Sequence, residues 1–396
     1  MMNRHRTSNR ASYDGVAIAA PITVAYEKTS AKPAHWWIGR AIRGVIDQLG
    51  ITPDAIDGLS VSSFTLGSDS AVSLTQHFGL SPRWLDHIPF GGASGLVALR
   101  RAARAVQSGD ADIIVCVAGD TNQPGSFQNL LARFSRFSED ATYPYGAGGP
   151  NASFALLTDH YMRKYGATRE DFGKLCVAQR HNAMAFPHAL MKKPLSLEQY
   201  LAGRPISDPI TLFDCVMPCA GAEAYAVMRA QTAAALGVRH ARLLSAIERH
   251  NAYATDPIQE RGGWAVDKDE LWAMAGITVD DVDFVQTYDD YPVISMMQFE
   301  DLGFCAKGEG PGFVRSHSFT NTGSFPHNTS GGQLSVGQAG AAGGSLGLVE
   351  AVRQLTGAPL GAPVADAKIG LVSGFGMINY DRGLCSAAAL LAAQDA

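Results

Sequence analysis

A glycine-rich turn, Pro89–Gly95, opens a helix and has the form of an acyl-transfer site without its nucleophile. The residues that follow, Leu96–Ser108, place apolar side chains at helical spacing and end at Gly109, as a buried helix does. Backbone N–H groups at the start of a helix have no partner within it, so such a turn can stabilise a thiolate or an oxyanion. The turn contains no cysteine. Its chemistry therefore cannot begin with attack by a thiol.

Ser94 lies in the same turn and is the residue most easily mistaken for a nucleophile. No Ser-His-Asp pattern accompanies it in the sequence. Serine is also a preferred residue at the start of a helix, where its hydroxyl accepts a backbone hydrogen bond. We therefore favour a capping role for Ser94 over a catalytic one.

Composition excludes several classes of function. The 396 residues, 46% of them hydrophobic, can bury a large core and suggest two or three domains. A net charge of −5 argues against nucleic acid as the main ligand. The six cysteines form no C-x-x-C pair, so no metal site is expected. Since Met1–Arg6 lacks the apolar core of a secretory signal and no apolar run is long enough to span a bilayer, we expect a cytoplasmic protein without a membrane anchor.

Helical and extended patterns alternate along the chain, which predicts an α/β architecture. Trp36–Leu49 has the spacing of an amphipathic helix and is followed by a strand around Leu59–Phe64. Asp112–Ala118 is a continuous apolar run typical of a strand in the middle of a sheet. Ala152–Thr158 is a further predicted strand.

The chain contains an internal sequence repeat. Gly50–Asp57 and Gly276–Asp283 are identical at five of eight positions, and each copy leads into a predicted strand. The helix and strand that end at Ala118 also have a counterpart in a helix ending near Gly357 and the strand Ile369–Ser373. Similarity at this long spacing indicates a duplicated domain. We therefore predict two related halves, 1–240 and 241–396.

The region 121–230 is irregular and rich in proline, glycine, histidine and aromatic residues. Long segments inserted into a compact domain are usually lids or binding loops. We predict that this inserted loop domain covers a substrate. Its histidines, His181 and His188, are more typical of a substrate loop or the surface than of a catalytic centre.

Taken together, these features resemble the thiolase superfamily, and most closely its sterol-carrier-protein type. The duplicated halves, the turn before the helix, Tyr288–Tyr291, Asn328–Ser335 and Gly374–Gly376 occur in the order of that family. The resemblance implies a five-layer αβαβα fold, in which each half has a mixed five-stranded sheet. It also implies a homodimer, no bound cofactor and a coenzyme A thioester as substrate.

The departures from the thiolase pattern fall at the residues that carry thiolase chemistry. The acyl-accepting cysteine of the family falls on Gly92, its histidine on Gly337–Ala339, and its second cysteine on Val372–Ser373. Ordinary thiolysis is therefore not expected. Gly91 and Gly92 are expected to leave room and backbone donors where the sulfur would stand. Ser373 and Gly376 are candidate substrate-binding residues.

The thiolase-like aldolases of steroid side-chain degradation resemble this chain at Tyr288 and at the paired glycines. Such enzymes cleave a β-hydroxyacyl-CoA by a retro-aldol reaction that needs no acyl-enzyme. Tyr288 is the candidate base, but a tyrosine pKa of about 10 requires a neighbouring cation, hydrogen bonds or a proton relay. Backbone N–H groups near Gly92 and Gly376 are candidate oxyanion donors. The aldolases have a second tyrosine where our alignment places Gln338, which cannot shuttle a proton.

Two further residues and two other functions stay open. Asp289 is more typical of an orienting or capping residue than of a base, and His327 is either an acid or relay, or a loop residue bonded locally. One alternative is a catalytically silent subunit that supports a separate small OB-fold and zinc-ribbon protein, as some members of the family do. The other is an acyltransferase, similar to acetyl-CoA acetyltransferase, with a non-standard site.

Overall fold

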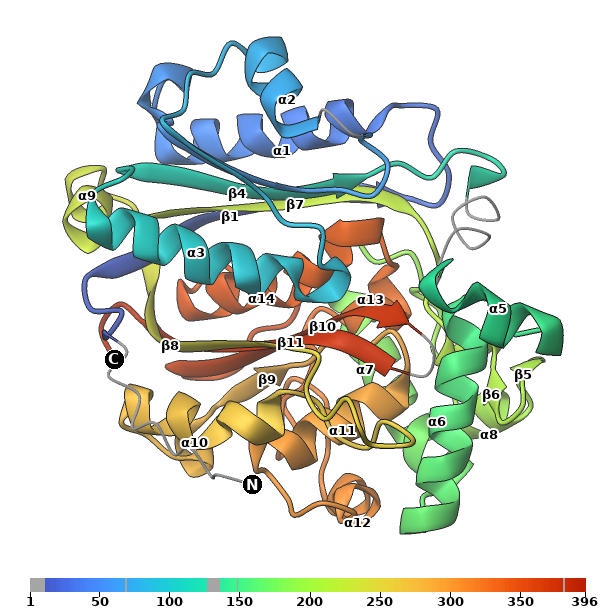
Figure 1. Cartoon of the computed structure of the whole chain (residues 1–396). Helices are drawn as coiled ribbons and strands as arrows, with labels where there is room; N and C mark the ends of the chain where they lie inside the picture. Colours follow the sequence, from blue (N-terminus) through green and yellow to red (C-terminus); the bar gives the residue numbers. More distant parts are fainter. Residues whose placement is uncertain (1–10, 68–69, 127–135, 148, 380–381) are drawn as a thin grey trace.

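The protein is built from alternating layers of helices and sheets. The computed structural model describes residues 11–67, 70–126, 136–147, 149–379 and 382–396, so the predicted Met1–Arg6 segment and residues 127–135 of the predicted insert lie outside it. In Figure 1, helices α1 (Ala34–Leu49) and α2 (Ser70–Phe78) cover one sheet. Helices α3 (Ser94–Ser108) and α14 (Gly343–Leu355) lie between two sheets, and α10 (Trp264–Ala275) and α11 (Pro292–Leu302) cover the other sheet. This arrangement confirms the predicted α/β architecture of two stacked halves.

The first half contains a mixed sheet of five strands, the number expected. Their order is β3-β2-β4-β7-β1, with β2 parallel to β3 and β4, and β7 antiparallel to β4 and β1. The bounds are β1 (Val16–Glu27), β2 (Gly58–Ser62), β3 (Trp84–His87), β4 (Ile113–Asp120) and β7 (Ala220–Arg229). Every residue of β4 is buried, as the continuous apolar run Asp112–Ala118 predicted for a central strand.

The second half repeats this strand order, except that a single bridge takes the place of the edge strand. Its strands β8 (His240–His250), β11 (Arg382–Ala393), β10 (Ile369–Asn379) and β9 (Phe284–Gln286) follow in that order, and β8 pairs with β1 over a short stretch. Beyond β9, at the position that β3 has in the first half, the described residues give a single parallel bridge between Val285 and His327. The second sheet therefore has four described strands where five were expected.

The repeated segments, Gly50–Asp57 and Gly276–Asp283, occupy equivalent positions in the two halves. Gly50 and Gly276 end helices α1 (Ala34–Leu49) and α10 (Trp264–Ala275) with φ of 66° and 69°, a left-handed conformation that favours glycine. Asp57 then accepts hydrogen bonds from the N–H groups of Asp112 and Ile113 at the start of β4. Asp283 accepts the same bonds from Lys368 and Ile369 at the start of β10. The predicted duplication is thus confirmed down to single hydrogen bonds.

Two further helices occupy equivalent places between the sheets. Helix α3 (Ser94–Ser108) precedes β4 and helix α14 (Gly343–Leu355) precedes β10, and each is preceded by a short 3-10 turn. These turns are η2 (Gly91–Ala93) and η7 (Gly340–Ala342). One apolar core fills the space between the sheets, and two more lie beneath the outer helices. The glycine-rich turn therefore lies at the centre of the molecule.

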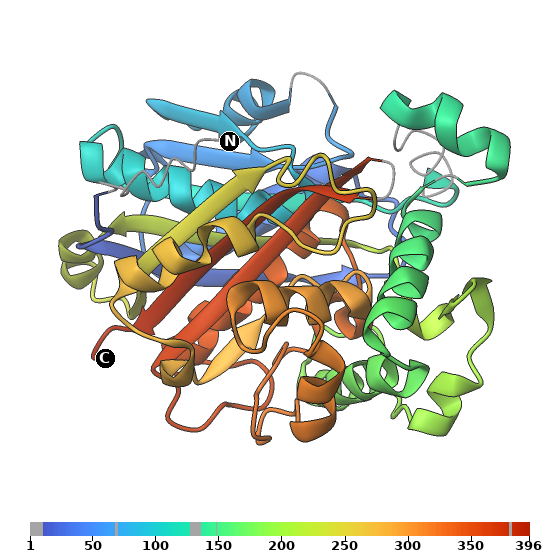
Figure 2. The same ribbon diagram turned by 60° about the horizontal axis from the view of Figure 1, so that its bottom comes forward.

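A group of helices lies beside the layers, at the right of Figures 1 and 2. It contains α5 (Glu139–Thr142), α6 (Pro150–Tyr165), α7 (Arg169–Ala185), α8 (Leu197–Leu201) and the small strands β5 (Pro205–Ser207) and β6 (Ile210–Thr211). The prediction of a strand at Ala152–Thr158 is wrong, because these residues lie in α6. Phe154, Leu157 and Tyr161 are buried on that helix at helical spacing.

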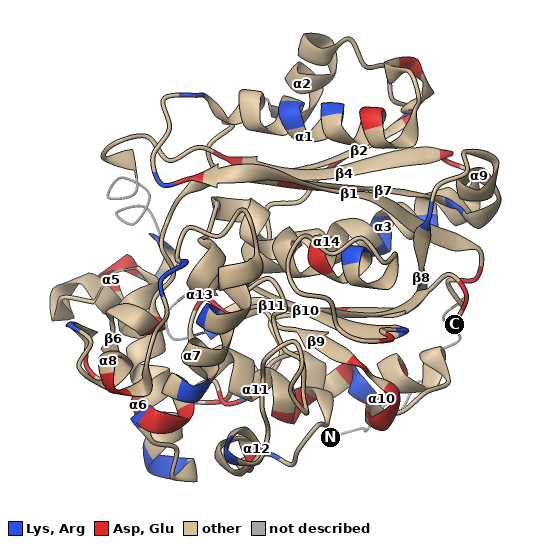
Figure 3. Ribbon diagram, turned by 180° about the vertical axis from the view of Figure 1, so that it is seen from behind, with Lys and Arg blue, Asp and Glu red and all other residues tan. Residues whose placement is uncertain are grey.

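The remaining helices lie on the first sheet or complete the second half and its connections. They are α2 (Ser70–Phe78), α9 (Ala230–Ala235), α11 (Pro292–Leu302), α12 (Gly310–Ser316) and α13 (Gly332–Val336). Within the described ranges, no helix combines the length and apolar character that a bilayer span requires. Figure 3 shows Lys and Arg interspersed with Asp and Glu over several helices.

Candidate active site

A pocket of about 100 Å³ lies where the two halves meet the inserted helices. It collects residues from η2, α6, the segment after β9, the loop before η7, and strands β10 and β11. The lining residues are Phe64, Gly91, Gly92, Pro150, Phe154, Tyr288, Asp290, Gln338, Gly340, Phe375, Gly376, Met377, Ile378 and Gly383. Its wall is mostly apolar, with three polar side chains. The structure thus brings Gly91, Gly92, Tyr288, Gln338 and Gly376 together, as the sequence predicted.

The three polar side chains form one hydrogen-bonded group. The Tyr288 hydroxyl donates to Asp290 Oδ2 over 2.7 Å. Gln338 Nε2 donates to the Tyr288 oxygen at 2.9 Å and to Asp290 Oδ2 at 3.1 Å. Gln338 therefore holds the other two side chains in place, a role that an amide can fill without transferring a proton.

Gly92 does not leave open space. A Cβ atom at this position would lie 2.0 Å from Cε2 and 2.1 Å from Cζ of Tyr288, and 2.3 Å from the carbonyl oxygen of Phe375. The expectation that Gly92 provides room for a bound group is therefore wrong. The Tyr288 ring occupies the space that a cysteine side chain would need, and only glycine fits beneath it.

Gly376 fits just as closely on the other side of the turn. A Cβ at Gly376 would lie 2.4 Å from the Phe90 carbonyl oxygen and 2.8 Å from the Gly92 nitrogen. Strand β10 therefore packs directly on the turn, backbone against backbone. The N–H of Gly92 lies in the first turn of η2, where a backbone N–H has no partner within the helix. Its use as an oxyanion donor stays a prediction.

Tyr288, Asp289 and Asp290, which follow β9, differ in their pKa values. Burial, and then the adjacent Asp290 carboxyl, raise the pKa of Tyr288 above that of a free tyrosine. Burial raises the pKa of Asp290 to about 7. Burial also raises the pKa of Asp289 to about 6. Tyr288 therefore keeps its proton at neutral pH, whereas Asp290 exchanges one there.

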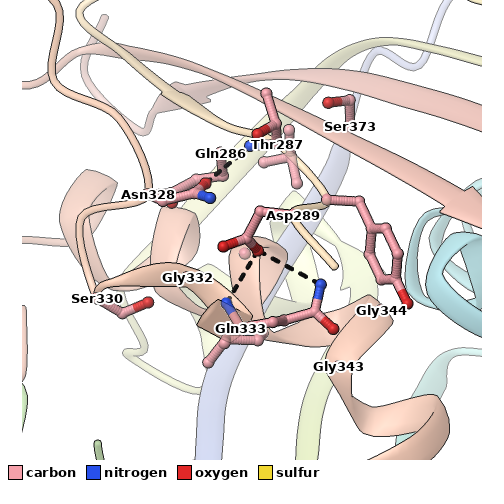
Figure 4. A pocket seen from close by; sticks show the side chains of 14 residues that line it. Gln286, Thr287, Asp289, Asn328, Ser330, Gly332, Gln333, Gly343, Gly344 and Ser373 are labelled. Atoms are coloured by element: carbon pink, nitrogen blue, oxygen red, sulfur yellow. Dashed lines mark hydrogen bonds between the residues drawn. The ribbon is translucent and has the colours of Figure 1, made fainter. Parts of the chain in front are cut away.

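Asp289 points away from this group. Its carboxylate accepts the backbone N–H groups of Gln333, at 2.9 Å, and Leu334, at 3.3 Å, near the start of α13. Figure 4 shows it turned toward Gln333, in a second cavity that also includes Asn328 and Ser373. This geometry fits the orienting or capping role expected of Asp289.

Ser373 acts on the site indirectly through Gln298. The Ser373 hydroxyl donates to Gln298 Oε1 at 2.6 Å. The same amide accepts the Tyr288 backbone N–H at 3.2 Å and donates to the Tyr288 carbonyl at 2.8 Å. Ser373 does not line the pocket with Tyr288 and Asp290. It fixes the side chain that clamps the backbone of Tyr288.

Two other candidates lie outside the pocket. Ser94 Oγ donates to the Ile88 carbonyl and accepts the Phe90 N–H, each at 3.0 Å, so it closes the turn and the expected capping role at the start of α3 is wrong. His327 is fully buried, packs edge-on against Phe299 and has Nε2 2.7 Å from Thr287 Oγ1. Burial lowers the pKa of His327 to about 3, so the imidazole is neutral. The structure does not bring His327 to Tyr288.

Asp290 is a site residue that the sequence reasoning missed. The signal was present in Tyr288-Asp289-Asp290, because side chains two apart in an extended segment point to the same side. Tyr288 and Asp290 thus share the pocket, and Asp289 between them points elsewhere. Phe154 and Pro150 were also missed, since their proximity depends on how α6 packs against the layers.

Comparison with known proteins shows what the chain resembles. Residues 250–385 match the model described as Thiolase C-terminal domain-like. Over 364 residues the chain is 29% identical to 17-hydroxy-3-oxo-4-pregnene-20-carboxyl-CoA lyase of Mycobacterium tuberculosis, covering 88% of this chain and 93% of that protein. The chain thus resembles the thiolase family in its C-terminal part and this lyase over most of its length.

Two more proteins resemble the chain over most of its length. A steroid side-chain-cleaving aldolase of Thermomonospora curvata is 28% identical, covering 91% of this chain and 95% of that one. A solved structure named Ltp2-ChsH2(DUF35) aldolase superposes with a TM-score of 0.82 at 25% identity, covering 96% of this chain and 98% of that one. The predicted thiolase fold, and its likeness to steroid side-chain aldolases, are confirmed.

Proposed function

We propose that this thiolase-superfamily protein cleaves a β-hydroxyacyl-CoA by a retro-aldol reaction, without a cysteine acyl intermediate. The observation that carries the proposal is the Tyr288 ring, which fills the thiol position above Gly92 and directs its hydroxyl toward Asp290. The relatives named as a pregnene-carboxyl-CoA lyase and a side-chain-cleaving aldolase support the same class of substrate. The apolar wall of the pocket suits the carbon skeleton next to the reacting bond.

The reaction balances within the substrate and the site. A base takes the proton of the β-hydroxyl, the Cα–Cβ bond breaks, and its electron pair forms the thioester enolate. The enolate then takes a proton at Cα. The products are a ketone or aldehyde and a shorter acyl-CoA, and backbone N–H groups near Gly92 and Gly376 are the candidates to stabilise the enolate oxygen.

The acyltransferase alternative lacks a nucleophile at this pocket. Of the described residues that line it, none is cysteine, serine or threonine. Cys116 and Cys219 are buried elsewhere in the fold, and burial raises the pKa of both thiols. The alternative of a catalytically silent subunit requires a partner protein, so it is tested by assays with and without that partner. The related solved aldolase is named for two components, Ltp2 and ChsH2(DUF35), so we also propose a separate OB-fold and zinc-ribbon partner.

Replacing Tyr288 by phenylalanine is expected to lower cleavage by about 10²–10⁴-fold, since the pocket loses one positioned proton-transfer group. A panel of β-hydroxyacyl-CoA thioesters, assayed with and without a candidate partner, would be analysed by mass spectrometry for the carbonyl product and the shorter thioester. Tyr291→Phe is the matched control. Tyr291 is buried nearby, but its hydroxyl bonds Asn151 Oδ1 at 2.6 Å and it does not line the pocket.

Three results would count against this function. Unchanged cleavage by Tyr288→Phe would remove this hydroxyl from the reaction. An acyl adduct in the intact mass of the protein would support the acyltransferase. Absence of cleavage across the panel, with and without the partner, would favour the silent subunit.

A further inference from the structure

The two carboxylate oxygens of Asp290 have different surroundings. Oδ2 accepts hydrogen bonds from Tyr288 and Gln338. Oδ1 is buried and has no hydrogen-bond partner among the described residues, although the side chain lines the pocket. A buried carboxylate oxygen without a partner is unfavourable, and such groups in native proteins usually have a functional reason. The missing partner fits a hydroxyl of a bound ligand.

The other two members of the group cannot serve as the base. The Tyr288 hydroxyl already donates its proton to Asp290, and both burial and this carboxyl favour the protonated phenol. The Gln338 amide does not ionise near neutral pH, so it cannot take up the proton. Among the described residues, the polar side-chain partners of the Tyr288 hydroxyl are a carboxyl and an amide, and neither is the cation that would make it a base. Asp290 is therefore the member of the group able to accept a proton.

We propose that Asp290 is the catalytic base of this site and that Tyr288 is its acid. This assignment rests on the proposed retro-aldol function. Asp290 Oδ1 accepts the β-hydroxyl proton while the Cα–Cβ bond breaks. Tyr288 then protonates the enolate at Cα, and the Asp290 carboxyl turns its protonated oxygen toward the phenolate and returns the proton to it. Both residues return to their starting state, and the step needs no further reactant.

The fold holds the pair for this exchange. Gln298 clamps the Tyr288 backbone from both sides, so the segment after β9 cannot slide along the pocket. Gln338, in the loop before η7, donates hydrogen bonds to both Tyr288 and Asp290. A pKa of about 7 places Asp290 where a base exchanges protons readily at neutral pH. Since the Gln338 amide does not titrate near neutral pH, the Asp290 carboxyl is the second group of the site that can exchange a proton with Tyr288.

Asp290→Asn is the direct test, because the amide oxygen can still accept the Tyr288 hydrogen bond. We expect cleavage to fall by about 10²–10⁴-fold while circular dichroism and the unfolding midpoint show a folded protein. In the parent protein kcat/KM should rise with pH through about 7, since Asp290 must be ionised to act, and this inflection should be absent from Asp290→Asn. Asp290→Ala should regain activity with added formate, which replaces the lost carboxylate.

Asp289→Asn is the matched comparison, because Asp289 is an adjacent buried carboxyl that faces α13. It should keep the inflection, displaced somewhat to lower pH because the Asp289 charge helps to raise the pKa of Asp290, even where its stability falls. If the parent protein cleaves the thioesters and Asp290→Asn retains both the rate and the inflection, Asp290 is not the base and the retro-aldol function stands. If the parent protein cleaves none of them, the function and this assignment fail together.

Discussion

Gly92→Ala is expected to destabilise the protein by about 3 kcal/mol and to reduce activity by about 10²-fold or more. The added methyl would lie 2.0 Å from the Tyr288 ring and 2.3 Å from the Phe375 carbonyl oxygen, far inside van der Waals contact. The ring can turn away only by breaking its bonds to Asp290 and Gln338. The carbonyl belongs to β10, an inner strand of the second sheet, so it cannot move freely. Urea denaturation and the cleavage assay measure the two effects.

Gly91→Ala provides the comparison for this substitution. It adds the same methyl one residue earlier, where the nearest atom is Sδ of the flexible Met377 side chain at 3.0 Å. Its φ of 54° lies in the left-handed region, so a cost of about 1–2 kcal/mol is expected from the backbone alone. In a Tyr288→Ala background, Gly92→Ala should cost less, because the ring has gone and the Phe375 contact remains. Parent-like stability and activity of Gly92→Ala would mean that the ring leaves this space free.

The duplicated fold could be predicted from sequence because its signals are local. Gly50 and Gly276 each end a helix in a conformation that suits glycine, and Asp57 and Asp283 each tie one strand start to the next. The strand predicted at Ala152–Thr158 was wrong for the converse reason. A short apolar run fits a strand or one face of a helix equally well, and packing against the layers decides in favour of α6.

The site was predicted only in part, because its decisive contacts join residues far apart in the chain. The sequence indicated Gly92 and Tyr288 separately, but not that the ring of one lies on the backbone of the other. His327 stands beside Asn328 in sequence, yet its side chain turns into an aromatic cluster away from the pocket. Asp290 was passed over for Asp289, although alternation along an extended segment distinguishes them.

Asp120 lies at the end of β4 and holds two segments of the pocket wall. Its buried carboxylate accepts four hydrogen bonds at Oδ1, two from backbone N–H groups of Phe64 and Thr65 and two from the hydroxyls of Ser63 and Thr65. Oδ2 accepts the Ala341 N–H at 2.7 Å. One side chain therefore joins the loop that carries Phe64 to the turn η7 that follows Gln338. Both segments line the pocket.

Asp120→Ala is expected to destabilise the protein by about 3–5 kcal/mol, measured by urea denaturation. Burial raises the pKa of Asp120, so removing the carboxyl relieves some unfavourable desolvation. Five donors would then lose their acceptor, and each buried donor left unpaired costs about 1 kcal/mol or more, so the loss outweighs the relief. Asp120→Asn distinguishes the two sets of hydrogen bonds. Its side-chain oxygen can still accept those from the Phe64 loop, whereas its NH₂ group would face the Ala341 N–H and could not accept a hydrogen bond from it. We therefore expect an intermediate stability and a rate reduced chiefly through Gln338, whereas equal stability of all three proteins would show that the two segments are held by other contacts.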